Sequence, residues 1–218
     1  MLQSMKKEIA TLHYITQDLT DFSHDYLTLE ACKGGVRWIQ LRVKNQEYSA
    51  WLEIAKKTKD VCDKYNAVLI INDNVRIAKE VNAHGVHLGL KDTNPREARK
   101  ILGDNAIIGG TANTLEDIKK LYACDVDYIG LGPYTYTETK QNLSPVLGLH
   151  GLKNIVTAIS YIHLNQNNNI PIVAIGGITG NDVAMILDSG VNGIAISSAI
   201  GMSLDKAKSA SDFLQLLD

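Results

Sequence analysis

Short hydrophobic runs recur along the whole chain, and each is followed by a longer segment in which hydrophobic and polar residues alternate at helical spacing. Runs of this length that are almost continuously apolar indicate strands buried on both faces. We expect strands at residues 12–16, 36–42, 67–71, 86–88, 106–109, 128–131, 171–175 and 193–196. This pattern is typical of a parallel sheet covered by helices.

The segments between these runs predict helices. In the longest one, Trp51, Ala55 and Cys62 belong to a hydrophobic series that recurs every three or four positions and defines one buried face. Pro95 suits a first helical turn, and Thr114 with Asp117 has the spacing of a capping box. We expect helices at residues 21–31, 48–65, 75–81, 95–102, 114–122, 149–159, 181–189 and 204–217. The polar tract 165–169 predicts a loop.

Eight alternations of strand and helix within 218 residues predict a closed (β/α)8 TIM barrel rather than an open, doubly wound sheet. No linker or change of composition divides the chain, so we expect a single domain over residues 1–218. The sequence leaves the oligomeric state open, and a homo-oligomer is compatible with it.

Charge and composition reduce the number of function classes that the chain could belong to. The formal net charge of −2 gives no electrostatic argument for binding nucleic acid or an anionic membrane surface. We find no signal peptide and no apolar run of about 20 residues, and therefore expect a cytoplasmic protein without a membrane span. Cys32, Cys62 and Cys124 form no CxxC pair and predict small buried hydrophobic residues in a reducing compartment.

Polar residues just past each strand are the first candidates for a site, because a TIM barrel builds its active site at the carboxyl ends of its strands. Gln40, Arg42 and Lys44 share one face of the second strand and its extension, and a guanidinium beside an ammonium suits a diphosphate. The alternative is that these side chains only solvate the strand end.

Asp73 and Asp92 follow the third and fourth strands. Two carboxylates at neighbouring strand ends predict a Mg²⁺ site, because Mg²⁺ in proteins takes one or two carboxylates, water and phosphate oxygens. Each aspartate also has an ordinary structural alternative: Asp73 as a helix cap, and Asp92 as a turn residue. His87 lies beside this predicted site, but we expect it to be a core histidine bonded to the backbone.

A second anion site is predicted from the loops after the sixth, seventh and eighth strands. The sixth strand opens into a loop of unusual length that carries hydroxyls at Thr137 and Thr139 and an ammonium at Lys140. Gly177 and the serines 197–198 follow the seventh and eighth strands, where barrels often hold phosphate. The glycines are also compatible with a purely packing role.

Seven short motifs together resemble the thiamine phosphate synthase family, in that family's order and from about Leu12 to the last helix. They are the segments 40–44 (QLRVK), 71–73 (IND), 86–89 (VHLG, with Asp92), 111–114 (TANT), 130–133 (GLGP), 137–140 (TETK) and 173–178 (VAIGGI). The resemblance implies a Mg²⁺-dependent transferase that joins hydroxymethylpyrimidine diphosphate to a thiazole phosphate and releases diphosphate.

The resemblance also implies roles for individual residues. Asp73 and Asp92 would hold Mg²⁺. Catalytic roles would belong to Arg42, Lys44, Thr111 and Lys140. The substrate-binding residues would be Gln40, Leu41, Arg42, Val43, Lys44, Asn72, Thr111, Thr137, Glu138, Thr139, Lys140, Gly177, Ser197 and Ser198. In the family, the pyrimidine loses diphosphate first and the thiazole nitrogen captures the resulting cation, so the catalytic demand is electrostatic and excludes water.

Two alternatives share the barrel. A thiazole tautomerase of the same family would isomerise a thiazole phosphate without joining it to the pyrimidine, using a histidine near the position of Thr111. A phosphate-binding barrel without catalysis would leave the two aspartates without a role. The chain departs from the family at Leu90, where glutamine is usual, and at Ser197, where an aliphatic residue is usual.

Overall fold

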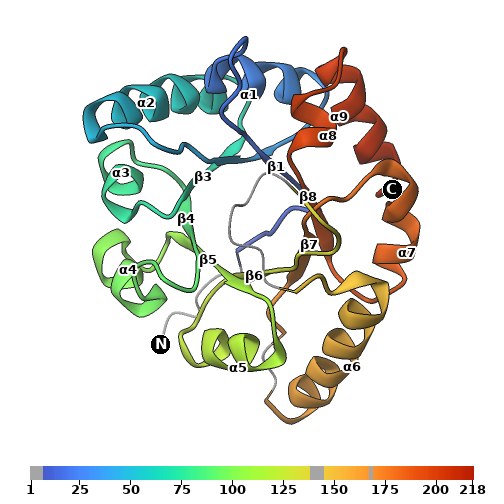
Figure 1. Ribbon diagram of the computed structural model, residues 1–218. Helices are drawn as coiled ribbons and strands as arrows, with labels where there is room; N and C mark the ends of the chain where they lie inside the picture. Colours follow the sequence, from blue (N-terminus) through green and yellow to red (C-terminus); the bar gives the residue numbers. More distant parts are fainter. Residues whose placement is uncertain (1–6, 138–144, 167–168) are drawn as a thin grey trace.

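Eight parallel strands close into a barrel, and helices surround it (Figure 1). The computed structural model describes residues 7–137, 145–166 and 169–218. For residues 161–166 it describes the backbone only. The strands pair in sequence order, and they are β1 (Leu12–Ile15), β2 (Trp38–Leu41), β3 (Val68–Asn72), β4 (Gly85–Leu88), β5 (Ile107–Ala112), β6 (Tyr128–Leu131), β7 (Ile172–Ile175) and β8 (Gly193–Ile196). Because β8 also pairs with β1, the barrel is closed, and the predicted fold class is confirmed.

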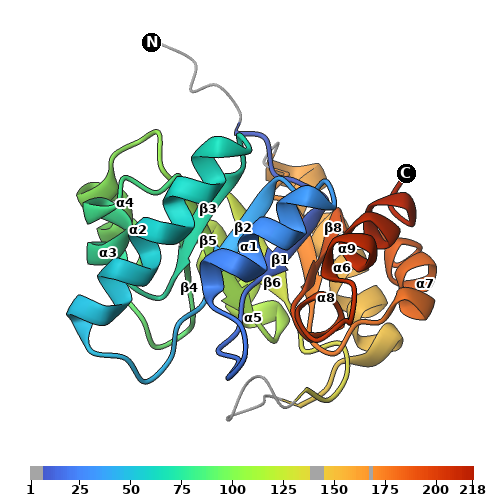
Figure 2. The same cartoon turned by 90° about the horizontal axis from the view of Figure 1, so that it is seen from above.

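The helices lie outside the strands in chain order. They are α1 (His24–Lys33), α2 (Tyr48–Lys64), α3 (Val75–Glu80), α4 (Pro95–Leu102), α5 (Leu115–Ala123), α6 (Gly148–Gln166), the 3-10 turn η1 (Gly180–Asp182), α7 (Val183–Leu187), α8 (Ser198–Gly201) and α9 (Lys206–Gln215). In the side view the loops after β1 and β2 lie at the lower edge, which is the carboxyl end of the strands (Figure 2).

Capping side chains explain where several helices begin. The predicted signals at Pro95 and at the capping box of Thr114 and Asp117 are both confirmed. The prediction for α1 was three residues too early, because the Ser23 side chain accepts the backbone N–H of Tyr26 and starts the helix at His24. Likewise, Asp205 caps α9, so that the helix begins at Lys206 rather than at residue 204.

Three further expectations were wrong in detail. The polar tract 165–169 was expected to be a loop, but α6 extends through its first two residues to Gln166. The helix expected at 181–189 is divided into η1 and the shorter α7. The short helix α8 directly after β8 was not predicted, because four residues are too few to show a helical period.

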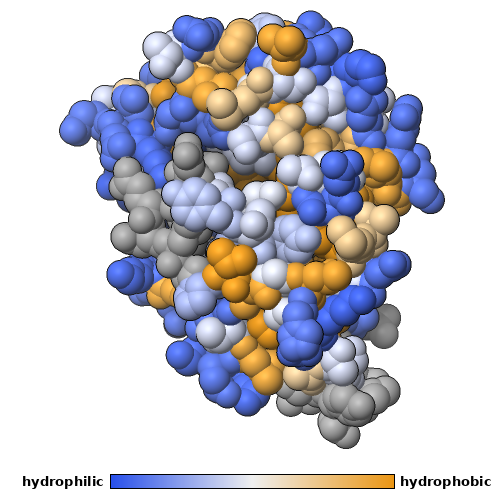
Figure 3. Space-filling view, turned by 45° about the vertical axis from the view of Figure 1, so that its right-hand side comes forward, coloured by the Kyte–Doolittle hydropathy of each residue, from blue (hydrophilic) through white to orange (hydrophobic). Residues whose placement is uncertain are grey.

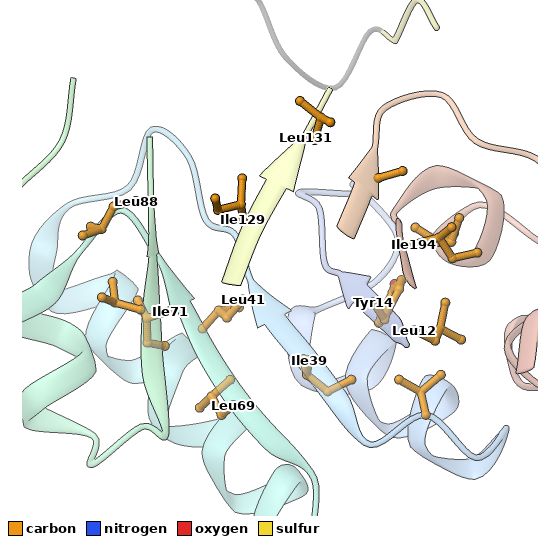
Figure 4. Close-up of a cluster of buried hydrophobic side chains, with 14 of the residues drawn as sticks. Leu12, Tyr14, Ile39, Leu41, Leu69, Ile71, Leu88, Ile129, Leu131 and Ile194 are labelled. Atoms are coloured by element: carbon orange, nitrogen blue, oxygen red, sulfur yellow. The ribbon is translucent and has the colours of Figure 1, made fainter. Parts of the chain in front are cut away.

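The main hydrophobic core lies between the barrel and its helices. Side chains on a strand alternate between two faces, and one set from each strand points outward into this layer. Figure 4 shows part of it, including Leu41, Ile71 and Leu131 from β2, β3 and β6. Cys32 and Cys62 are buried in the same layer, as predicted, whereas Cys124 is only partly buried. Burial raises the pKa of the Cys32 thiol to about 11.

The barrel interior at the amino end of the strands is filled by aromatic rings. His13 stacks on Trp38 with their ring centroids 4.3 Å apart, and Tyr128 meets both rings edge-on. These three side chains and the smaller hydrophobic residues of a second cluster form the floor of the barrel. The floor is nearly inaccessible to solvent, since all three side chains are no more than 1% exposed.

The outer surface mixes hydrophilic and hydrophobic residues. On the face shown in Figure 3, blue side chains predominate around the rim, and the orange ones form smaller groups nearer the centre. Met202 and Leu204, in the turn between α8 and α9, are the most exposed large hydrophobic residues together with Tyr136. Within the described part of the chain, no helix has the length and hydrophobicity to cross a membrane.

Candidate active site

Two joined hollows occupy the carboxyl end of the barrel. The inner hollow has a volume of about 190 Å³ and is lined by the ends of most strands. The outer hollow, of about 550 Å³, lies against the loops after β1 and β2 and against α8. Arg42, Thr137, Gly177 and Ser198 line both, so the two hollows share a wall.

Most of the predicted site residues line these hollows. Those on the inner hollow are Gln40, Arg42, Asn72, Asp73, Thr111, Thr137, Gly177, Ser197 and Ser198. Lys44 lines the outer hollow beside Arg42. The two anion sites predicted separately from the sequence therefore share one opening.

Other predicted residues do not reach the hollows with their side chains. The side chains of Leu41 and Val43 point into the outer core, which leaves only their backbone for the substrate contact that the family resemblance implies. The strand period explains this, because neighbours of the inward-facing Gln40 and Arg42 must face outward. Glu138, Thr139 and Lys140 lie outside the described residues.

The interior of the barrel changes from apolar to polar toward this end. Along β2, Trp38 belongs to the floor, Gln40 lies above it, and Arg42 follows just past the strand. The same change occurs on β3, where Ile70 belongs to the floor and Asn72 lines the inner hollow. These two strands thus contribute both to the packed floor and to the polar site.

Gln40 and Asn72 orient each other across neighbouring strands. Gln40 Nε2 donates to Asn72 Oδ1 at 2.7 Å, and Gln40 is only 4% exposed. In this arrangement Asn72 Nδ2 is able to donate to a ligand. An amide donor facing an inner hollow is suited to a phosphate oxygen or a ring nitrogen.

His87 is bonded to two side chains, which corrects the expectation of a backbone partner. Its Nδ1 lies 3.0 Å from the Tyr128 hydroxyl, and its Nε2 lies 2.9 Å from Thr111 Oγ1. Burial raises the pKa of Tyr128, so the hydroxyl keeps its proton. In a neutral His87 ring, Nδ1 accepts this proton and Nε2–H donates to Thr111. The Thr111 hydroxyl proton is then directed away from His87 and is available to a ligand.

Asp73 is held at the wall of the inner hollow by an unusual backbone conformation. Its φ of 64° is left-handed, and its N–H donates to the His87 carbonyl at 2.8 Å. The role of helix cap belongs to the next residue, since Asn74 Oδ1 accepts the N–H of Ile77 at 3.0 Å. The alternative interpretation of Asp73 as a cap is therefore wrong, and a residue held in this strained region suggests a functional constraint.

Asp92 lies at the edge of the inner hollow rather than in its wall. Its Oδ2 accepts the N–H of Gly89 at 2.7 Å, and Gly89 itself lines the hollow. Asp92 thus has the turn role that was its structural alternative, but this role uses only one carboxylate oxygen. The second oxygen has no hydrogen-bond donor among the described residues.

The donor set fits Mg²⁺. Asp73 and Asp92 follow strands that are hydrogen-bonded neighbours, and both offer hard carboxylate oxygens at the same end of the barrel. No cluster of three or more acidic, histidine or cysteine side chains that could form a complete protein cage exists in the described ranges. This is compatible with Mg²⁺, which usually keeps water and substrate phosphate among its ligands.

Among the described residues, Arg42 supplies the positive charge of the inner hollow. Burial lowers the pKa of its guanidinium, and the carboxylates of Asp73 and Asp18 oppose that shift. An arginine retains its charge at neutral pH under such conditions. Arg42 and Asp73 therefore present a cation and an anion to the same hollow, which suits a ligand made of a metal ion and a diphosphate.

Glycines after β7 let the chain after β6 approach closely. A Cβ on Gly177, which has a φ of 67°, would lie 2.4 Å from Thr135 Cγ2 and 2.6 Å from the Tyr136 carbonyl oxygen. Gly177 also lines both hollows, so close packing and exposure to a ligand coincide here. Nearby, Ser197 Oγ donates to Gln17 Oε1 at 2.9 Å, which directs this hydroxyl toward β1.

Sequence reasoning missed the contribution of the first strand. Gln17 and Asp18 follow β1 and line the outer hollow. The rule applied to the other strands, that polar residues just past an apolar run are candidates, would have found both. Asn113, whose side-chain amide donates to the Gly132 carbonyl, also lines the inner hollow.

The fold and the position of the hollows define a class: a (β/α)8 barrel with its ligand site at the carboxyl end of the strands. Residues 12–200 match the thiamine monophosphate synthase family, and the chain belongs to this family. The resemblance inferred from the sequence motifs is thereby confirmed.

Individual relatives cover nearly the whole chain. The thiamine-phosphate synthase of Bacteroides fragilis is 42% identical over 206 residues, which are 94% of this chain and 99% of that protein. That of Flavobacterium psychrophilum is 45% identical over 192 residues, covering 88% and 91%. The solved structure of a thiamine phosphate pyrophosphorylase from Pyrococcus furiosus superposes with a TM-score of 0.82, at 32% identity over 95% of each chain.

Proposed function

We propose that the protein is a thiamine-phosphate synthase, which joins hydroxymethylpyrimidine diphosphate to a thiazole phosphate and releases diphosphate. Family membership supports this activity. The observation that carries it in the structure is the shared wall of the two hollows, because Arg42 lines the inner hollow together with Asp73 and the outer hollow together with Lys44. One opening can then hold two phosphorylated substrates next to each other.

In this proposal the basic side chains of β2 and its loop hold the leaving diphosphate. The bond between the pyrimidine methylene carbon and the diphosphate oxygen breaks, and both electrons leave with the oxygen. Arg42 and Lys44 stabilise that added negative charge in a site partly shielded from water. Asn72 Nδ2 and the Thr111 hydroxyl donate hydrogen bonds to the pyrimidine diphosphate.

Asp73 and Asp92 are the residues that would hold Mg²⁺. When bound, Mg²⁺ supplies positive charge to the diphosphate oxygens. Gly89 fixes the orientation of the Asp92 carboxylate, and the His87 carbonyl fixes the backbone of Asp73. The Asp92 carboxylate and the backbone that carries the Asp73 side chain are therefore held in place before any ligand arrives.

The thiazole phosphate is assigned to the part of the shared wall formed after β7 and β8. Gly177 and Ser198 line both hollows there, and Ser198 begins α8. The thiazole nitrogen forms the new bond to the methylene carbon with its own lone pair, so this step needs no general base. The inner hollow contains an uncharged donor set around Thr111, which is compatible with that chemistry.

A product assay tests the proposal. Purified protein, Mg²⁺ and both substrates should yield thiamine phosphate and diphosphate in equal amounts, and omission of either substrate should abolish both products. Isomerisation of the thiazole phosphate alone, without thiamine phosphate from the complete mixture, would favour the tautomerase alternative. Binding of both phosphorylated compounds without any product would favour a barrel that only binds phosphate.

A further inference from the structure

A group of side chains beside the outer hollow is not explained by contact with substrate. His24, the first residue of α1, is 6% exposed and lies against the chain that leaves β1. Its Nδ1 is 2.8 Å from Thr16 Oγ1, and its Nε2 is 3.1 Å from Asp18 Oδ1. His24 itself lines neither hollow.

Thr16 and Asp18 in turn hold the backbone of the basic segment after β2. The N–H of Arg42 donates to Thr16 Oγ1 at 3.2 Å, and the N–H of Lys44 donates to Asp18 Oδ2 at 3.1 Å. These two amides come just after the regular β1–β2 pairing, which ends with the backbone bond from Thr16 N–H to the Gln40 carbonyl. Where the backbone hydrogen bonds between β1 and β2 end, the side chains of Thr16 and Asp18 therefore continue to hold the basic segment after β2.

The directions of these hydrogen bonds form one consistent set. An ionised Asp18 can only accept, so His24 Nε2–H donates to it. In the neutral ring Nδ1 is then an acceptor, and the Thr16 hydroxyl donates to it while accepting the N–H of Arg42. Burial lowers the pKa of His24, which supports the neutral ring. Replacing the imidazole by a side chain without these two groups would release both hydroxyl and carboxylate.

We propose that His24 is a positioning residue, which orients Thr16 and Asp18 so that they fix the backbone of Arg42 and Lys44 at the anion site. The inference rests on the proposed function for the identity of the anion, a diphosphate. The physical reason is preorganisation, since a basic segment that is already fixed loses less conformational freedom when the anion binds.

The test compares four variants. His24→Phe keeps a ring of similar size and removes both hydrogen bonds, whereas His24→Asn keeps an acceptor near the position of Nδ1. Thr16→Val removes the hydroxyl that holds Arg42. Thr28→Val is the matched control, because Thr28 is a buried threonine of α1 whose hydroxyl has no hydrogen-bond partner in the described structure.

The first readout is the affinity for inorganic diphosphate in the presence of Mg²⁺, measured by calorimetry. We expect His24→Phe and Thr16→Val to weaken binding about tenfold, as is usual when a hydrogen bond of this kind is lost. His24→Asn should recover part of the affinity, and Thr28→Val should bind like the parent protein. Equal affinity in all folded variants would overturn the proposal, and so would undetectable binding to the parent protein.

The second readout separates positioning from general damage. The KM for the pyrimidine diphosphate should rise about tenfold in His24→Phe and Thr16→Val, while the KM for the thiazole phosphate stays within about twofold. Equal rises in both would contradict the role. If His24→Phe does not fold, the Thr16→Val variant alone tests the proposal, because the valine side chain has nearly the same shape as that of threonine. If the parent binds diphosphate but makes no thiamine phosphate, the proposed function fails while calorimetry still tests the positioning role.

Discussion

The floor of this barrel is apolar, whereas its mouth, the carboxyl end with the two hollows, is lined by polar and charged side chains. Strands such as β2 and β3 contribute to both regions. At the floor, His13, Trp38 and Tyr128 pack ring against ring in a space closed to solvent. At the mouth, the next inward-facing positions of the strands are amides, hydroxyls and charges around two hollows. A residue's position along its strand therefore decides its role: residues near the amino end stabilise the fold, and residues near the carboxyl end form the site.

His87 connects the two regions. It reaches down to the Tyr128 hydroxyl of the floor and up to Thr111 in the inner hollow. Gly109 makes room for this arrangement, since a Cβ there would lie 2.3 Å from Tyr128 and 2.6 Å from His87. Mutations on the floor side of His87 should therefore change the free energy of unfolding. Mutations on the side of the hollows should change turnover.

The largest expected effect is at the floor. Trp38→Ala should lower the free energy of unfolding by about 3–5 kcal/mol, because it removes a fully buried ring and leaves a cavity. Denaturant titration measures this loss. Turnover per folded molecule should remain within about threefold, since Trp38 lines neither hollow. A large loss of turnover without a loss of stability would contradict the division.

At the mouth, a substitution should lower activity strongly and change the free energy of unfolding little. Arg42→Ala should lower kcat/KM by about 10²–10³-fold, the usual cost of removing one donor that stabilises developing charge. The free energy of unfolding should change little, because half-buried Arg42 lies outside the hydrophobic clusters. Steady-state kinetics with the pyrimidine diphosphate measures the effect. Arg76→Ala, at an exposed arginine in the first turn of α3 that lines neither hollow, is the control and should retain activity.

The pH dependence of stability should come in part from the floor. Burial lowers the pKa of His13 to about 3, whereas an unfolded histidine has a pKa near 6.5. The unfolded state therefore binds the proton first, and the stability due to neutral His13 is lost as the pH falls from about 6.5 toward 3, by about 1.4 kcal/mol per pH unit. In His13→Phe, which retains a stacked ring, the free energy of unfolding should depend less on pH over this window. Parallel curves for the parent and the variant would refute the assignment.

The smallest effect is expected at the outer edge of the mouth. Lys44→Ala should raise the KM for the pyrimidine diphosphate about tenfold and change kcat less than Arg42→Ala does, because Lys44 lines only the outer, more open hollow. The loss should shrink as salt is added, since the charge is screened there. A loss as large as that of Arg42→Ala would place the leaving diphosphate in the outer hollow instead.

Much of the fold could be predicted from the sequence, because buried parallel strands and long amphipathic helices leave strong local signals. The ends of the second and third strands were also informative, because they identified Arg42 and Asp73 as candidate site residues. The outward direction of Leu41 and Val43 follows from the strand period, but the family resemblance assigned them by motif alone.

Tertiary contacts account for what the sequence did not reveal. The bonds of His87 to Tyr128 and Thr111 join residues 41 and 24 positions apart in the chain. The positions of His24, Thr16 and Asp18 relative to Arg42 likewise depend on how α1 packs after the first strand. Helix α8 is too short for a periodic signal.

Arg42, Asp73 and Asp92 are the residues that we propose to hold a diphosphate with Mg²⁺ at the mouth of the barrel. A crystal structure of the protein with Mg²⁺ and diphosphate tests this proposal most directly. We predict a diphosphate in hydrogen-bond contact with the Arg42 guanidinium, and Mg²⁺ about 2.0–2.1 Å from carboxylate oxygens of Asp73 and Asp92. A diphosphate bound away from Arg42, or Mg²⁺ that contacts neither aspartate, would contradict the account.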